Sequence, residues 1–97
     1  QPIGTEPTFQ TSNVSAVPDG FGGVNFTGEA SLESGEYESA GMGQIAVTVI
    51  LRDESGYIVY GAIGFANRPT AERSVSFEVA GGKVPAYSSI DVYVQVW

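Results

Sequence analysis

The chain has 97 residues, of which 42% are hydrophobic, and its eleven acidic and four basic residues give a formal net charge of −7. This is enough apolar material for one folded domain, and the negative charge disfavours binding to nucleic acid or to an anionic membrane surface. Cysteine and histidine are both absent, which excludes a thiolate nucleophile, disulfides, a Cys/His zinc site and a Ser-His-Asp triad.

The first seven residues, Gln1 to Pro7, contain two prolines and one glycine and show no periodicity. We interpret them as an N-terminal arm or linker, followed by a single domain from Thr8 to Trp97. No window of the chain approaches the roughly 20 apolar residues of a membrane span. We therefore expect no membrane span, and the lack of cysteine leaves the cellular compartment open.

Alternation of apolar and polar residues predicts strands through most of this domain. Val24 to Leu32, Val75 to Val79 and Ile90 to Val96 each show a clear period of two. In Ile45 to Leu51 the second face is only half polar, which indicates a central strand or an additional cover. In Tyr57 to Phe65 both faces are so apolar that the pattern does not decide which one points inward.

Turn-forming residues separate these segments, and nowhere do apolar residues recur at helical spacing over three turns. Six or seven short strands in one domain of this size predict an all-β fold, an antiparallel β-sandwich with an immunoglobulin-like arrangement. The predicted turns are Pro18-Asp19-Gly20, Ser34-Gly35-Glu36, Gly41-Met42-Gly43, Asn67-Arg68-Pro69 and Ala80-Gly81-Gly82.

Three segments of the sequence, taken in order, carry a resemblance to a known kind of domain. Val24 to Leu32 carries Gly28, "VTVILRDESGYIVYGAIGFA" contains two apolar stretches around an acidic corner, and "RPTAERSVSFEV" joins a proline loop to a further strand. In this order they resemble the FxLYD domain family of small bacterial and archaeal extracytoplasmic β-sandwiches. The resemblance covers the chain from about Thr8 to Val96 and implies a surface or envelope module without a defined active site.

Two acidic groups are candidates for a metal or acid/base site. Asp53-Glu54-Ser55-Gly56 supplies only two adjacent carboxylates, which does not fit an EF-hand loop. Its residue order instead predicts a hairpin corner that ends on a left-handed glycine. Glu33, Glu36 and Glu38 share one loop and could bind calcium or act as an acid/base pair. We expect this loop to be solvated, with no catalytic residue, metal or cofactor.

Tyr93 and Trp97 lie on one face of the predicted last strand. Aromatic rings on a flat sheet bind sugars or anchor protein interfaces, and Tyr57 and Tyr60 are further candidates for such a role. The alternative for Trp97 is packing against the N-terminal segment.

Asn13-Val14-Ser15 and Asn25-Phe26-Thr27 match the N-glycosylation sequon, which points to an exported protein. The strand phase predicts that Asn25 faces solvent.

These features favour a non-enzymatic structural or interaction module in the extracellular space or cell envelope. Its expected partner is another protein or further copies of itself, bound through the N-terminal arm or an open edge strand. The alternative function is a carbohydrate- or ligand-binding module that uses the exposed aromatics. A hydrolase built on the glutamate loop ranks behind both.

Overall fold

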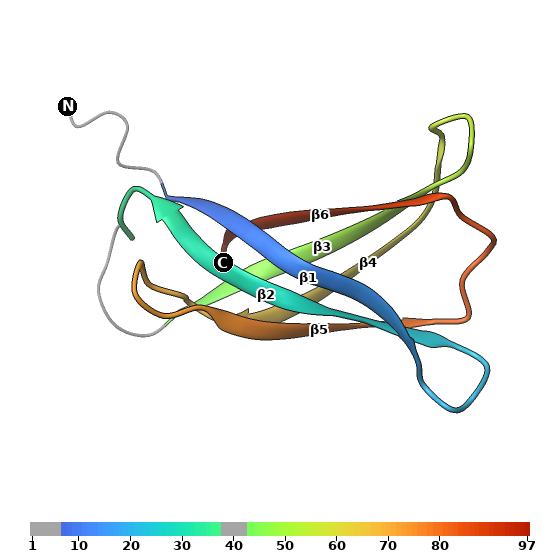
Figure 1. Ribbon diagram of the computed structural model, residues 1–97, viewed down its shortest axis with the longest axis horizontal. Coiled ribbons are helices and arrows are strands. Elements are labelled where there is room, and N and C mark those ends of the chain that lie inside the picture. Colours follow the sequence, from blue (N-terminus) through green and yellow to red (C-terminus); the bar gives the residue numbers. More distant parts are fainter. Residues whose placement is uncertain (1–6, 38–42) are drawn as a thin grey trace.

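The alternating segments of the sequence form two stacked sheets in the computed structural model, which describes residues 7–37 and 43–97 (Figure 1). In these ranges all six elements are antiparallel strands, and the predicted β-sandwich is confirmed. None of these residues forms a helix that could cross a membrane. The strands are β1 (Thr8–Pro18), β2 (Val24–Ser34), β3 (Gln44–Arg52), β4 (Ile58–Asn67), β5 (Val75–Gly82) and β6 (Ser89–Val96).

One sheet has the order β1-β2-β5 and the other has the order β4-β3-β6, with the core between them. In β2 the buried positions are Phe26, Gly28 and Ala30, which confirms the predicted phase and leaves Asn25 on the outer side. Each fully buried Val, Leu, Ile or Phe side chain stabilises the fold by about 1.5–3 kcal/mol. The largest side chains buried in this way are Phe26, Ile45, Val47, Val49, Leu51 and Val79.

One side of the sandwich is closed by β4 and β5, although these strands belong to different sheets. A Cβ atom on Gly64 would lie 3.0 Å from the backbone oxygen of Glu78 and 3.0 Å from Cγ2 of Val79. Further along, the Tyr60 hydroxyl donates a hydrogen bond to the carbonyl of Gly81 at 2.6 Å. On the opposite side of the sandwich, β1 lies near β6, and the two strands are not paired in one sheet.

The strand β5 extends further than the sequence predicted. A turn was expected at Ala80-Gly81-Gly82, but β5 continues to Gly82. Gly81 is buried against the ring of Phe26. A Cβ atom at this position would lie only 2.6 Å from Cε2 of that ring. The glycine therefore makes room for an aromatic ring in the core, and the turn prediction at this position was wrong.

The strand β1, whose bounds the sequence did not define, pairs with β2 and contains a β-bulge. The register shifts between Ser12 and Ser15, and Asn13 has a φ of 55°. Of the predicted N-terminal arm only Pro7 belongs to the described residues, so the arm stays a prediction.

Candidate functional site

The acidic corner Asp53-Glu54-Ser55-Gly56 is the turn of the β3–β4 hairpin. The Gly56 amide donates to the Asp53 carbonyl at 3.0 Å, and the Asp53 amide donates to the Tyr57 carbonyl at 2.9 Å. Gly56 has a φ of 89°, which is the left-handed conformation that the sequence predicted. The prediction of a hairpin corner is confirmed.

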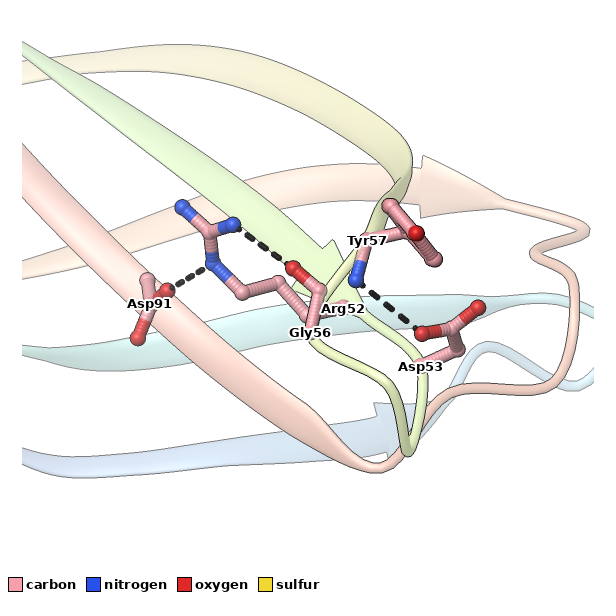
Figure 2. Close-up of polar contacts among 5 residues, drawn as sticks. All are labelled: Arg52, Asp53, Gly56, Tyr57 and Asp91. Carbon is pink, nitrogen blue, oxygen red and sulfur yellow. Dashed lines mark hydrogen bonds and ion pairs between the residues drawn. The ribbon is translucent and has the colours of Figure 1, made fainter.

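The Asp53 carboxylate makes its hydrogen bonds within this turn. Its Oδ1 atom accepts the amide hydrogens of Ser55 at 2.9 Å and of Tyr57 at 3.0 Å, and Figure 2 shows the second of these bonds. An aspartate that bonds to the backbone two residues on is a common device for stabilising a turn. Asp53 therefore has a structural role in the hairpin.

Arg52 connects the same hairpin to β6 (Figure 2). Its Nε atom donates to Oδ2 of Asp91 at 2.7 Å, and its Nη1 atom donates to the Gly56 carbonyl at 3.0 Å. Hydrogen bonding to Asp91, and secondarily to Tyr93, raises the pKa of Arg52 above its ordinary value. The guanidinium stays cationic and balances the charge of Asp91.

The glutamates of the predicted acidic loop are not brought together with Asp53. Glu33 and Glu36 are exposed near the end of β2, whereas the Asp53 turn is at the opposite end of the sandwich (Figure 1). Glu38 lies outside the described residues. Within residues 7–37 and 43–97, no three Asp, Glu, His or Cys side chains are grouped as a metal site requires.

Tyr37, which the sequence analysis did not single out, fixes the chain after β2 to the β4–β5 loop. Its hydroxyl donates to the Pro69 carbonyl, and the Arg68 guanidinium carbon lies 4.9 Å from its ring centroid. The ring is also 6.2 Å from that of Phe9. Burial raises the pKa of Tyr37 above 10.0, and the nearby charge of Arg68 partly opposes this shift.

The four aromatic candidates lie in three different places. Tyr93 and Trp97 are 53% and 67% exposed and share the outer side of the β4-β3-β6 sheet, as predicted. Tyr57 is 72% exposed at the hairpin turn. Tyr60 lies on the inward side, where it bonds to Gly81, so it cannot join a platform with the other three rings.

Two large apolar residues of β4, Ile63 and Phe65, lie on the same outer side as Tyr93 and Trp97. The rings of Phe65 and Trp97 meet edge to face with centroids 5.1 Å apart. A contact of Trp97 with residues 1–6 would lie outside the described residues. We call this surface the outer apolar face, and its members are Ile50, Ile58, Ile63, Phe65, Tyr93 and Trp97.

In the sequence, this face was signalled by two stretches, Ile45 to Leu51 and Tyr57 to Phe65. In each of them, both of the alternating sets of positions contain apolar residues. The first stretch predicted a central strand or an additional cover. β3 is indeed the central strand of its sheet. Ile63 and Phe65 were not named as candidates, because alternation alone did not decide which face of β4 points outward.

The outer side of the β1-β2-β5 sheet is chemically different. Its outward positions are mostly Ser, Thr and Glu, and a shallow hollow beside the β1 bulge is lined partly by Asn13, Glu29 and Glu78. Both sequon asparagines belong to this sheet, Asn13 exposed and Asn25 half-buried. The sandwich therefore has one polar and one apolar outer side.

Comparisons of the chain with protein-family models, with curated proteins and with solved structures gave no match.

Proposed function

We propose that this chain is a non-enzymatic interaction module of the cell exterior or envelope, and that the outer apolar face binds protein, including further copies of the chain. The observation that carries the proposal is the contrast between the two outer sides of the sandwich. Ile58, Ile63 and Phe65 are 59%, 53% and 43% exposed on one side, whereas the other side carries mostly Ser, Thr and Glu, with Val17 as its exposed large apolar residue.

The physical argument concerns grouping and charge. Single exposed apolar residues are ordinary on a protein surface, but a contiguous group of large ones marks an interaction site. The centres of protein interfaces are depleted of charge and enriched in aromatic residues. At the edge of the outer apolar face, Arg52 and Asp91 neutralise each other at 2.7 Å, so the chain's net negative charge is not concentrated there.

The test is the double variant Ile63→Ser with Phe65→Ser, measured by analytical ultracentrifugation over a range of concentrations. We expect the average mass of the unchanged protein to rise with concentration and that of the variant to rise clearly less. The matched control is Thr27→Ala with Ser76→Ala on the polar side, which should associate normally. Association of the Ile63/Phe65 variant equal to that of the unchanged protein would contradict the proposal.

A second candidate function, carbohydrate binding, is favoured by one observation. Tyr93 and Trp97 present accessible rings on the same face, and exposed aromatic rings on a sheet stack against sugars. A glycan array on the unchanged protein and on Trp97→Ala separates the two functions. Specific binding that is lost in the variant supports the carbohydrate role, and absence of binding to any glycan contradicts it.

A further inference from the structure

We propose that the free edge of β6 is a docking edge for a second copy of this chain. The two β6 strands pair antiparallel about a two-fold axis and join two three-stranded sheets into one sheet of six strands. This inference rests on the proposed function, because it specifies how a self-associating module would meet its copy. Strand addition of this kind uses main-chain hydrogen bonds for affinity.

The other three sheet edges are covered or protected. β4 and β5 close against each other, as the 3.0 Å approach of a Gly64 Cβ to the Glu78 backbone oxygen shows. β1 carries a bulge, Asn13 in a left-handed conformation and Pro18, all features that prevent edge pairing. β6 pairs with β3 without a register shift and contains no proline or lysine. Its outer edge pairs with no strand of the described residues, although β1 lies near part of it.

The hydrogen-bond phase of β6 shows which backbone groups point to this edge. The Trp97 amide donates to the Gln44 carbonyl of β3 at 2.9 Å. Bonded and non-bonded pairs alternate along an antiparallel ladder, so Gln95, Tyr93 and Asp91 also direct their amides and carbonyls toward β3. The groups that point away belong to the residues between them, which are Ile90, Val92, Val94 and Val96.

The side chains of these same four residues point toward the core and are incompletely covered. The β3 residues with which they pair are buried. Ile90, Val92 and Val94, in contrast, are only half-buried, and Val96 is 38% exposed. Four β-branched residues at alternate positions of an open edge favour addition of a further strand. A strand added there would cover the exposed parts of these side chains and satisfy their backbone groups.

The reason to name a second copy as the occupant is that β6 can face its own equivalent with apolar residues opposite apolar residues and without an uncompensated charge. Two chains of net charge −7 repel each other over most of their surfaces. β6 carries a single charged residue, Asp91, and Arg52 balances it at 2.7 Å. The β6 edge is thus locally neutral, and its alternating apolar residues would meet apolar residues of a copy related by a two-fold axis.

One pairing register uses the free backbone groups of all four residues. It places Ile90 opposite Val96 of the second copy and Val92 opposite Val94 of the second copy. Tyr93 then faces Tyr93 of the second copy across the axis in a non-hydrogen-bonded pair. Asp91 faces Gln95 of the second copy, so no like charges meet directly. The two outer apolar faces become one continuous surface.

The chain contains no cysteine, so a single introduced thiol tests this register directly. Cα atoms in a non-hydrogen-bonded antiparallel pair lie about 4.5 Å apart, within the range that a disulfide can bridge. Under mild oxidation, Tyr93→Cys should form a disulfide-linked dimer. Ser76→Cys, exposed on the polar side, is the matched control and should stay monomeric. Equal cross-linking of both variants would overturn the register.

A proline variant tests the edge itself. Val92→Pro removes an amide that points away from β3, so the ladder within the monomer keeps its bonds. Ultracentrifugation should show association weakened by roughly tenfold or more, because two hydrogen bonds related by the axis are lost. Val92→Ala shortens the same side chain but keeps the amide, and it should associate with nearly the original affinity. Circular dichroism shows whether both variants stay folded.

The outcomes separate this inference from the proposed function. If Val92→Pro associates like the unchanged protein while Ile63→Ser with Phe65→Ser does not, the β6 edge is rejected and the outer apolar face remains the interaction surface. If the unchanged protein is monomeric at every concentration, both the β6 pairing and self-association are rejected.

Discussion

Backbone conformation at Gly56 is the residue-scale feature that defines the β3–β4 hairpin. Its φ of 89° lies in a region that β-branched residues rarely adopt, and a Cβ atom there would meet nothing within 4 Å. Gly56→Val should therefore lower the free energy of unfolding by roughly 1–2 kcal/mol through backbone strain alone. Urea denaturation measures this change.

The matched variant is Gly56→Asn, because asparagine tolerates the left-handed region better than other side chains. It should lose clearly less stability than Gly56→Val. Equal losses in the two variants would mean that strain at this position is not what the glycine relieves.

Ionisation of Tyr37 gives a second residue-scale prediction. Burial raises its pKa above 10.0, so the folded state holds the phenolic proton more tightly than the unfolded chain does. The corresponding stabilisation is complete below pH 10.0 and is lost as the pH rises through the raised pKa of the folded state. In Tyr37→Phe, the decline of melting temperature above pH 10.0 should be less steep.

Spectrophotometric titration of the phenolate checks the same point independently. The unchanged protein should show a late ionisation step above pH 10.0, and Tyr37→Phe should lack that step. A late step that persists in the variant would assign the raised pKa to another tyrosine.

At the scale of strands, β4 between Ala62 and Ala66 carries small residues on its inward face and large ones on its outward face. Ala62, Gly64 and Ala66 point toward the core, whereas Ile63 and Phe65 point outward. The reason is the close approach of β5, which leaves a Gly64 Cβ only 3.0 Å from backbone oxygen. An apolar pattern that ignores side-chain size cannot detect this arrangement.

Gly64→Ala and Gly61→Ala test the close approach within one strand. The added methyl at Gly64 would press on the backbone of β5, whereas at Gly61 it would meet Cδ1 of Ile50 at an ordinary 3.5 Å. We expect Gly64→Ala to destabilise the protein by roughly 1–3 kcal/mol and Gly61→Ala to be near neutral. Thermal unfolding of the pair decides the point, and similar melting temperatures would argue against tight β4–β5 packing.

Strand prediction succeeded where one alternation of apolar and polar residues runs through the strand without interruption. β2 keeps a single phase from Phe26 to Ala30, and β6 alternates from Ile90 to Val96. In β1 the phase changes at the bulge, from Phe9 and Thr11 before it to Val14 and Ala16 after it, so no single alternation spans the strand. A bulge depends on pairing with β2 and leaves little trace in the local sequence.

The candidate site was predicted in part for the same reason. Tyr93 and Trp97 stood out because their strand has a polar outer set, and their placement together was correct. Tyr60 was offered as an exposed ring, but the β4–β5 contact turns it inward to Gly81. Such choices depend on which elements pack together, and local alternation carries no information about that.

At the scale of the whole molecule, the excess of acidic residues dominates the electrostatics. Eleven acids against four bases destabilise the compact state by self-repulsion, and the Arg52–Asp91 pair is partly exposed, so it offsets little of this repulsion. Raising sodium chloride from about 0.01 M to about 0.1 M shortens the screening length from about 30 Å to about 10 Å. The melting temperature should therefore rise with salt.

This measurement belongs at a protein concentration where the chain is monomeric, or in Val92→Pro, so that association does not contribute. Glu54→Gln removes one negative charge from an exposed turn position and should show a smaller salt effect. A melting temperature that falls with salt would indicate that attractive ion pairs outweigh repulsion.

Trp97 is the single tryptophan of the chain, and its position against Phe65 on the outer apolar face has a spectroscopic consequence. With 67% of its surface exposed, its fluorescence in the monomer should resemble that of a solvated indole and change little when the core unfolds. When a partner covers that face, the emission should shift to shorter wavelength. The protein thus carries an intrinsic reporter that responds to binding at its surface more than to loss of its fold.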